Sequence, residues 1–251
     1  MNRSIWLVLV ISAAVLLCCE TAGAREAPFA AGERLVYELR WGVVPAGEAV
    51  LEVIPEKNEN GEQYHFRLTA RTNSFVDIIY KVRDTIHSYT DKEMTHSLHY
   101  IKNQHEGRTR RDITVRFDWD KNEAKYTNFD RDKRTITLIP GAFDPFSILF
   151  FTRLCTLADN VVIERPVTDG KKMVMGRAQV VERETVRTRY GSFDSFVVEP
   201  ELRHVGGVFE KSPNAKMRLW FSADSKQYLV RLQSKVVVGS FVADLVAVEK
   251  K

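Results

Sequence analysis

The chain has 251 residues, a formal net charge of +4 at pH 7 and 44% hydrophobic residues. This length suits a single all-β domain and is sufficient to bury a core without disulfides or structural metals. The charge is too mild to argue for a nucleic-acid partner.

The N-terminus has the pattern of a cleaved export signal. Arg3 gives a positive charge, residues 5–17 form an apolar run, and residues 22–24 provide a small-residue cleavage site. The apolar run is shorter than the about 20 residues that a bilayer-spanning helix needs. We therefore expect a signal peptide over residues 1–24.

Cleavage after Ala24 predicts a periplasmic mature chain, residues 25–251, with a single β-rich domain. An exported location also disfavours nucleic acid as a partner. The alternative is a lipoprotein anchored through Cys18 or Cys19. A lipid-modified cysteine follows a small residue, and Leu17 precedes Cys18, so this alternative is disfavoured.

Strand patterns begin shortly after the signal segment. Apolar side chains occupy every second position at Leu35, Tyr37, Leu39 and Trp41. This period of two is typical of a half-buried antiparallel strand. Similar patterns predict strands over 35–41, 49–54, 64–71, 81–91, 94–103, 108–119, 123–128, 133–139, 161–167, 173–190, 195–202, 216–222, 228–237 and 240–249. Residues 74–80 are ambiguous and are compatible with one helical turn.

Residues 140–157 contain the one long segment that favours a helix. Asp144 can accept hydrogen bonds from the first free amides, and Pro145 suits the first turn. Apolar residues cover nearly the whole circumference, so several surfaces must bury it. We predict a mainly β fold: a large curved antiparallel sheet or open β-barrel around one central α-helix, at about residues 144–157.

Four histidines, His87, His96, His99 and His105, are close in the sequence and raise the question of a metal site. His96 and His99 have opposite parity in a strand and would point to opposite faces. His99 and His105 share a face but would lie roughly 20 Å apart. Only cross-strand pairing with His87 could create a site, and no cysteine or carboxylate has a familiar metal spacing. We predict solvent-facing histidines and no metal.

No residue pattern indicates a reaction. The chain has no Gly-x-Ser-x-Gly elbow and no phosphate-binding loop. Cys155 is the single cysteine of the expected mature chain and is predicted to be buried in the helix. We predict no catalytic residue and no cofactor, so an enzyme ranks third among the functional hypotheses.

Two groups of arginines are more suggestive. Arg108, Arg110 and Arg111 lie beside a predicted turn, and Arg187 and Arg189 share one face of a later strand. A solvated outer face is the simpler interpretation. The alternative is a patch for anionic lipid headgroups or a sugar-phosphate partner.

Aromatic residues recur on the predicted strands and on the helix. Most are expected to form core around the helix, and the alternative is that some line an apolar cavity between sheet and helix. The candidate ligand-lining residues are Tyr37, Trp41, Phe66, Phe117, Phe146, Phe150 and Trp220.

Several longer sequence segments resemble those of a known family. They are Gly32-Glu-Arg-Leu-Val-Tyr-Glu-Leu-Arg-Trp-Gly42, Pro45-Ala-Gly47, Val82-Arg-Asp-Thr-Ile-His-Ser88, His105-Glu-Gly107, Phe117-Asp118, Pro140-Gly-Ala-Phe-Asp-Pro-Phe-Ser147, Trp220-Phe-Ser-Ala-Asp224 and Gly239-Ser-Phe241. The chain resembles the exported bacterial family catalogued as domain of unknown function 3108. The resemblance implies an exported, mostly β protein of Gram-negative-type bacteria, and it carries over no active-site residue.

The leading functional hypothesis is non-enzymatic binding of an apolar or amphipathic envelope molecule between sheet and helix. The candidate ligands are a lipid, the acyl part of a lipoprotein, or a glycolipid, and peripheral contact with a membrane is compatible with this role. The competing hypothesis is a structural or assembly partner of another envelope protein, bound through an exposed sheet edge.

Overall fold

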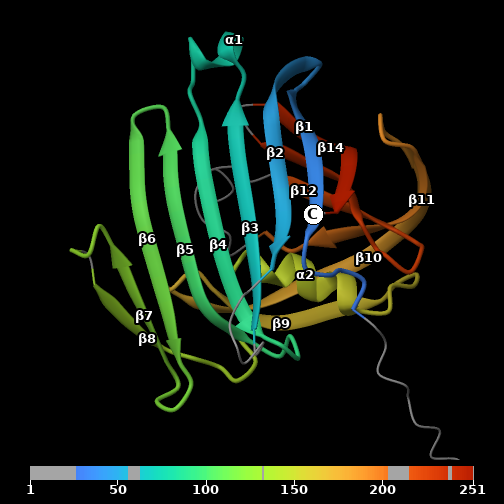
Figure 1. The fold of residues 1–251 in the computed structure, drawn as a ribbon. Coiled ribbons are helices and arrows are strands. Elements are labelled where there is room, and N and C mark those ends of the chain that lie inside the picture. Colours follow the sequence, from blue (N-terminus) through green and yellow to red (C-terminus); the bar gives the residue numbers. More distant parts are fainter. Residues whose placement is uncertain (1–26, 56–62, 132, 203–214, 237–238, 251) are drawn as a thin grey trace, which may run out of the picture.

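The computed structural model describes residues 27–55, 63–131, 133–202, 215–236 and 239–250. The predicted signal segment and its cleavage site lie outside the described residues. Within them, one strongly curled sheet surrounds a short helix, as Figure 1 shows.

All strands of the described residues belong to one 14-stranded sheet with the order β8-β7-β6-β5-β4-β3-β2-β1-β14-β13-β12-β11-β10-β9. The strands are β1 (Glu33–Trp41), β2 (Val44–Ile54), β3 (Gln63–Thr72), β4 (Arg83–Asp91), β5 (Ser97–Glu106), β6 (Thr109–Asp118), β7 (Glu123–Asn128), β8 (Arg134–Thr137), β9 (Val162–Thr168), β10 (Met173–Arg187), β11 (Ser192–Pro200), β12 (Lys216–Ser222), β13 (Leu229–Val236) and β14 (Gly239–Lys250). Two helices complete the fold: α1 (Ser74–Asp77) and α2 (Ser147–Leu154).

Each strand pairs antiparallel with its sheet neighbours, and β1 pairs with β14, so the first and last described strands are neighbours inside the sheet. The order ends at β8 and β9, which are not paired to each other, so the sheet is open. This confirms the predicted large, curved antiparallel sheet. The described residues contain no helix with both the length and the apolar character that a membrane crossing requires.

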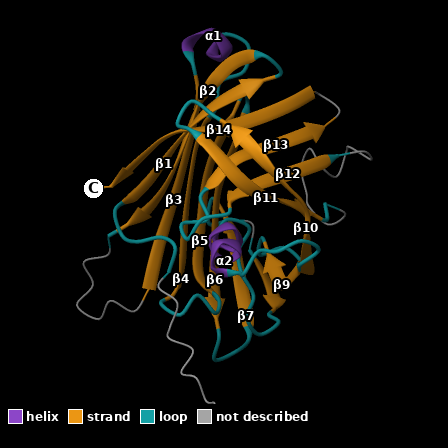
Figure 2. Ribbon diagram, turned by 90° about the vertical axis from the view of Figure 1, so that its right-hand side faces the viewer, coloured by secondary structure: helices purple, strands orange, loops and turns teal. Residues whose placement is uncertain are grey.

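The curl brings the two halves of the sheet against each other. Figure 2 shows α2 among the strands, while α1 lies at the far end of the molecule. Tyr37 and Ala49 of the first half pack with Val197 and Trp220 of the second half in one buried cluster. The core is therefore formed by contacts between distant parts of one sheet, and α2 fills the space that the curl leaves.

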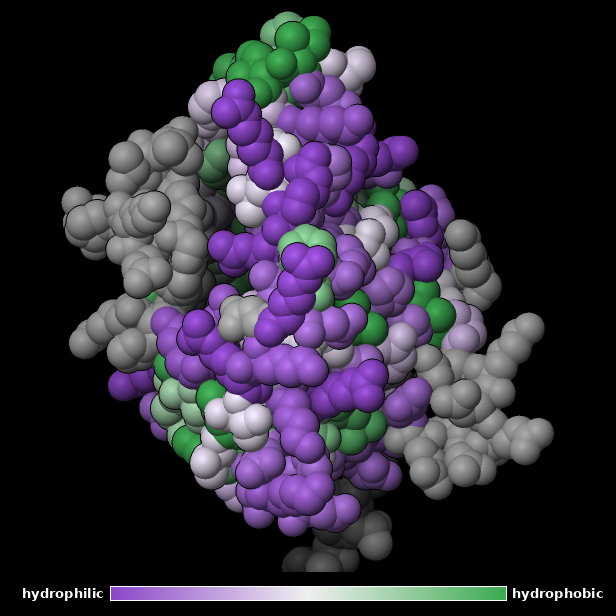
Figure 3. All heavy atoms as spheres, turned by 90° about the vertical axis from the view of Figure 1, so that its left-hand side faces the viewer, coloured by the Kyte–Doolittle hydropathy of each residue, from purple (hydrophilic) through white to green (hydrophobic). Residues whose placement is uncertain are grey.

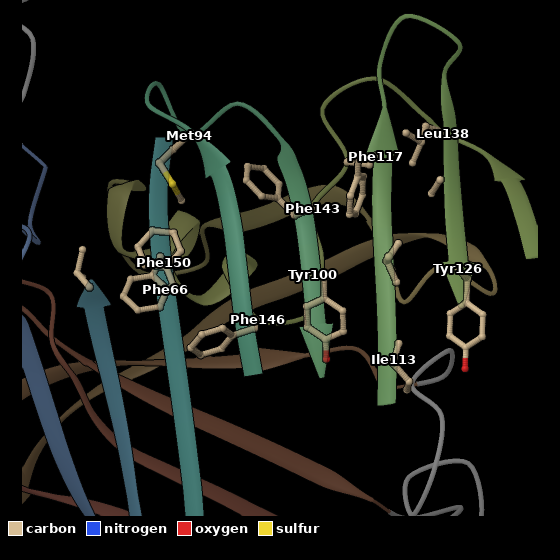
Figure 4. Packing of buried hydrophobic residues seen from close by; sticks show 14 of the residues in the cluster. Phe66, Met94, Tyr100, Ile113, Phe117, Tyr126, Leu138, Phe143, Phe146 and Phe150 are labelled. Carbon is tan, nitrogen blue, oxygen red and sulfur yellow. The ribbon is translucent and has the colours of Figure 1, made fainter. Parts of the chain in front are cut away.

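Helix α2 is anchored through the ring of Phe150, which is only 2% exposed. This ring stacks on Phe66 with centroids 3.8 Å apart and meets the edges of Phe29 and Phe146 at 5.4 and 5.6 Å. Figure 4 shows Phe66, Phe146 and Phe150 close together. Phe29 could not be expected in the core from the sequence, because the segment before β1 lacks any periodicity.

Asp144 joins the start of the helix to the sheet, and its side chain is fully buried. One carboxylate oxygen accepts hydrogen bonds from the backbone amides of Phe146 and Ser147 at 2.8 and 3.0 Å. The other accepts from the hydroxyls of Ser88, Ser97 and Ser147 at 2.6, 2.7 and 2.7 Å. The predicted capping role is confirmed, and the same carboxylate also fixes the helix to β4 and β5.

The helix is shorter than the predicted range 144–157, because it begins at Ser147 and ends at Leu154. Cys155 has extended backbone angles. The side-chain amide of Gln227 donates hydrogen bonds to the carbonyls of Arg153 and Cys155, which satisfies acceptors that a longer helix would have used internally. A distant residue therefore ends the helix.

Arg153 holds the end of α2 through a buried ion pair, with 3% of its side chain exposed. Its guanidinium donates to Glu33 of β1 at 2.6 Å and to the carbonyl of Lys226 at 3.0 Å. It also lies over the rings of Phe29 and Tyr228, at 5.2 and 5.6 Å from their centroids. Both ends of the helix are thus fixed by charged side chains that the fold buries.

Candidate functional site

The structure places six of the seven predicted ligand-lining aromatics in the buried core. These are Tyr37, Phe66, Phe117, Phe146, Phe150 and Trp220, each with 9% or less of its surface exposed. Trp41 lies apart from them at the end of β1, 48% exposed, and stacks on Phe241. The ligand-lining role of all seven residues stays a prediction.

Two of these buried aromatics also satisfy their polar atoms within the fold. The Tyr37 hydroxyl donates to the carbonyl of Leu229 at 2.7 Å. The indole nitrogen of Trp220 donates to a carboxylate oxygen of Glu184 at 2.7 Å. Neither polar atom is left to recognise a ligand in this arrangement.

A pocket of about 400 Å³ opens beside α2, where the curled sheet approaches itself. Four separate segments line it: the β4–β5 turn, the connection before α2, α2 itself and edge strand β9. The lining residues are Glu93, Met94, Thr95, Pro140, Gly141, Phe151, Arg165 and Pro166. The volume is in the range of small-molecule sites.

The walls of this pocket are held in place by backbone hydrogen bonds between the pre-helix connection and β9. The amide of Phe143 donates to the carbonyl of Pro166 at 2.9 Å, and the amide of Thr168 donates back to the carbonyl of Phe143 at 2.9 Å. The pocket therefore has a fixed wall on the β9 side, even though β9 is the last strand of the sheet.

The pocket combines an apolar floor with one cation. Met94 is 3% exposed, and Phe151 and Pro166 supply further apolar surface. The guanidinium of Arg165 lies 4.6 Å from the centroid of the Phe151 ring. Among the described residues, no carboxylate forms an ion pair with Arg165, and one of its guanidinium nitrogens donates to the carbonyl of Glu164 at 3.2 Å. The exposed Glu93 also lines the pocket. An apolar surface with a single available cation matches an amphipathic anion.

A second pocket of about 420 Å³ is lined by four arginines and two carboxylates, so its lining keeps a net positive charge. Arg189 pairs with Glu38 at 2.9 Å, and Arg40 and Arg231 both pair with Asp244. The full lining is Glu38, Arg40, Val43, Pro45, Arg187, Thr188, Arg189, Arg231 and Asp244. Only Val43 and Pro45 of this lining are apolar, so the second pocket suits a hydrophilic anion better than an amphipathic molecule.

The predicted anionic-partner patch divides into two places in the structure. Arg108 and Arg110 lie in the β5–β6 hairpin, with Arg111 next to them on β6, and all three are exposed. Arg187 is the last residue of β10 and Arg189 lies in the β10–β11 turn, both at the second pocket. The two groups do not form one continuous arginine cluster, and binding of an anionic partner stays a prediction.

Histidines meet across strands in a pair that the sequence did not indicate. His65 Nε2 lies 2.8 Å from His87 Nδ1, and the His65 ring stacks on Tyr89. Burial lowers the pKa of His87 and of His99, aided by the nearby Arg67 and Arg116 respectively. No group of three or more metal-binding side chains occurs within the described ranges.

Cys155 is half-buried, and burial raises the pKa of its thiol. Its sulfur lies 3.5 Å from the carbonyl of Phe151, one turn earlier. A thiol held in its neutral form is a poor nucleophile. The prediction that Cys155 is buried inside the helix is wrong, because Cys155 is the extended residue that follows α2 and is only half-buried.

The family described as Protein of unknown function (DUF3108) matches residues 36–246. The chain belongs to the DUF3108 family. The family description assigns no activity, so the DUF3108 site must be argued from its own residues. No curated protein matches the chain.

One solved structure shares the fold of this DUF3108 protein, and others have lower similarity. A β-barrel-like protein of domain of unknown function DUF1849 from Brucella abortus has a TM-score of 0.58 at 10% identity, covering 87% of this chain and 97% of that one. A Chlamydia trachomatis protein, CT021, has a TM-score of 0.36 at 5% identity, covering 88% of each chain. A candidate exported protein with a YmcC-like fold from Bacteroides fragilis has a TM-score of 0.31 at 10% identity, covering 89% of this chain and 98% of that one. The first likeness shows a shared β-barrel-like fold.

Proposed function

We propose that this protein is a non-enzymatic periplasmic binder of an amphipathic envelope molecule, held in the pocket beside α2. The observation that carries the proposal is the guanidinium of Arg165, which lies over the Phe151 ring in the pocket lining and forms no ion pair with a described carboxylate. A lipid, the acyl part of a lipoprotein, or a glycolipid offers both an apolar chain and an anionic or polar head. The sequence pattern of an export signal supports the periplasmic address.

The ligand position differs from the one that the aromatic residues predicted. The core rings of Phe66 and Phe150 stack at 3.8 Å, which leaves no room for a ligand between them. Phe151 instead presents its ring to the pocket from the next position of the helix. The proposed ligand therefore binds along one side of α2 and does not separate α2 from β3.

The alternative, a structural partner bound through a sheet edge, has weaker support. The β9 edge contains Pro166, which lacks an amide hydrogen, and part of this edge is already bonded to Phe143. The β8 edge, Arg134–Thr137, is short and mostly exposed, with polar side chains. Short edges, proline and charge are features that discourage strand addition.

Titration with myristoyl-lysophosphatidylglycerol below its micelle concentration tests the proposal, with calorimetric detection. We expect binding to the wild type, and Arg165→Gln should weaken it about tenfold through loss of a charge-assisted hydrogen bond. Arg183→Gln is the control, because Arg183 is an exposed arginine that also lies over an aromatic ring, Phe196 at 5.1 Å, but pairs with Asp194 and does not line the pocket. Equal affinities of wild type and Arg165→Gln, or no binding by the wild type, would contradict the proposal.

A further inference from the structure

Large apolar side chains are exposed together at one end of the molecule. Phe75, Ile78, Ile79 and Tyr80 of the β3–β4 connection are 64%, 84%, 74% and 49% exposed, and Val43 of the β1–β2 turn is 90% exposed. We name these five residues the α1 tip. Figure 3 shows hydrophobic surface at the position of α1, above a face that is mostly hydrophilic.

The β1–β2 turn and α1 are joined, so the tip is one surface. The amide of Asn73 donates to the carbonyl of Ala46 at 2.9 Å, and its side-chain amide donates to the carbonyl of Pro45 at 2.7 Å. The same side chain accepts from the amide of Val76 at 2.9 Å and so caps α1. Asn73 therefore fixes the short helix to the neighbouring turn.

The other side of the tip is fixed as well. Arg83 forms an ion pair with Asp77 at 2.6 Å, and this hydrogen-bonded contact lowers the pKa of Asp77 to about 2. A side chain at Gly107 would meet the ring of Tyr80 at 2.8 Å, so the β5–β6 hairpin packs directly against the tip. The exposed apolar residues thus project from a well-bonded turn, and their exposure is a built feature of the surface.

Cations surround the α1 tip. Lys81, Arg108 and Arg110 are exposed, and the Arg110 guanidinium donates to the carbonyl of Gly107 at 2.8 Å, which places it at the hairpin end beside Tyr80. The nearby acidic groups are less available. Asp77 is paired with Arg83, and the carboxylate of Asp84 accepts a hydrogen bond from the backbone amide of His105 at 2.8 Å.

We propose that the α1 tip docks the protein on an anionic lipid surface. The apolar side chains would enter the boundary between headgroups and acyl chains, while Lys81, Arg108 and Arg110 would meet lipid phosphates. The apolar tip matches the acyl region of a membrane surface, and the cations around it match the anionic headgroups. A protein partner would need a complementary apolar recess, and a second copy would bring the same cations face to face.

The tip is remote from the pocket beside α2, so the two proposals are independent. The tip precedes β4, whereas Met94 of the pocket follows it. The nine residues of β4 span about 30 Å. Docking through the tip would therefore hold the pocket away from the bilayer surface and accessible from the aqueous side.

Vesicle co-sedimentation tests the docking surface. The experiment uses residues 25–251, which contain every described strand and both helices, because the apolar N-terminal run could itself bind lipid. We expect binding to vesicles with 30% phosphatidylglycerol, weaker binding to pure phosphatidylcholine, and weaker binding at high salt. The double variant Ile78→Ser, Ile79→Ser should bind about tenfold more weakly, because it removes exposed apolar surface that only a bilayer would bury. Lys81→Gln with Arg108→Gln should lose the preference for anionic vesicles.

Two matched controls accompany these variants. Met175→Ser removes a 53% exposed apolar residue from β10, and Lys121→Gln with Lys125→Gln removes two cations near the β6–β7 turn, at the other end of β6 from the tip. Both should bind vesicles like the wild type. Unchanged binding by Ile78→Ser, Ile79→Ser would overturn the proposal. Sedimentation velocity without lipid gives a further check: self-association that this variant abolishes would assign the tip to a second copy and would also overturn it.

Discussion

Replacing Phe150 with aspartate is expected to unfold the domain. The ring is 2% exposed and contacts the rings of Phe66, Phe29 and Phe146. Losing such a buried ring costs about 3–5 kcal/mol, and burying an unpaired carboxylate adds several more. The sum is comparable to the whole stability of a typical domain, about 5–15 kcal/mol. Circular dichroism should therefore show loss of the folded β signal at 25 °C and no cooperative transition on heating.

Phe75→Asp is the control for this experiment, because it introduces the same carboxylate at a phenylalanine that is 64% exposed. Its free energy of unfolding should lie within about 0.5 kcal/mol of that of the wild type. If Phe150→Asp also melted like the wild type, α2 could not be central to the fold.

Asp144→Ala is expected to destabilise the domain by about 3–5 kcal/mol, because it removes the acceptor of several buried donors at once. Two backbone amides and the hydroxyls of Ser88, Ser97 and Ser147 bond to this carboxylate. For a domain of this size, the change corresponds to a fall in Tm of roughly 6–20 °C. Urea unfolding followed by tryptophan fluorescence would measure it.

Asp144→Asn separates the geometry from the charge. Asparagine keeps one carbonyl oxygen for the amides of Phe146 and Ser147 but replaces the oxygen that binds the three hydroxyls. Asp144→Asn should therefore lower the free energy of unfolding clearly less than Asp144→Ala does. Equal stability of Asp144→Ala and the wild type would show that the buried network does not hold the helix to β4 and β5.

The strands could be predicted because one face of each half-buried strand meets the core. The pattern over 216–222 gave the bounds of β12, and the alternation at Leu35 and Tyr37 located β1. The antiparallel pairing of strands that are consecutive in the chain can be predicted without information on contacts between distant residues. The open curl could also be expected from the apolar helix, which requires surrounding surface.

The length of α2 was predictable only in part. Local residues start the helix, since Asp144 and Pro145 lie beside its first turn. Its end depends on Gln227, which the fold brings to the carbonyls of Arg153 and Cys155. Phe29 was missed for the same reason, because its place in the core follows from tertiary packing alone.

The candidate pocket could not be found in the sequence, because four distant segments contribute to it. Arg165 has no local signal, since an arginine in an edge strand resembles any solvated residue until Phe151 lies beneath it. Residues 74–80 showed only an ambiguous helical turn. Apolar residues there suggest burial, and only the structure shows that Ile78 and Ile79 are exposed.

Native mass spectrometry of the protein purified from its own periplasm tests the central claim most directly. We expect a co-purifying amphipathic molecule of defined mass that organic extraction releases. The wild type and Arg183→Gln should retain this molecule, and Arg165→Gln should largely lose it. A protein of apo mass in every sample, or equal retention by Arg165→Gln, would contradict a ligand site beside α2.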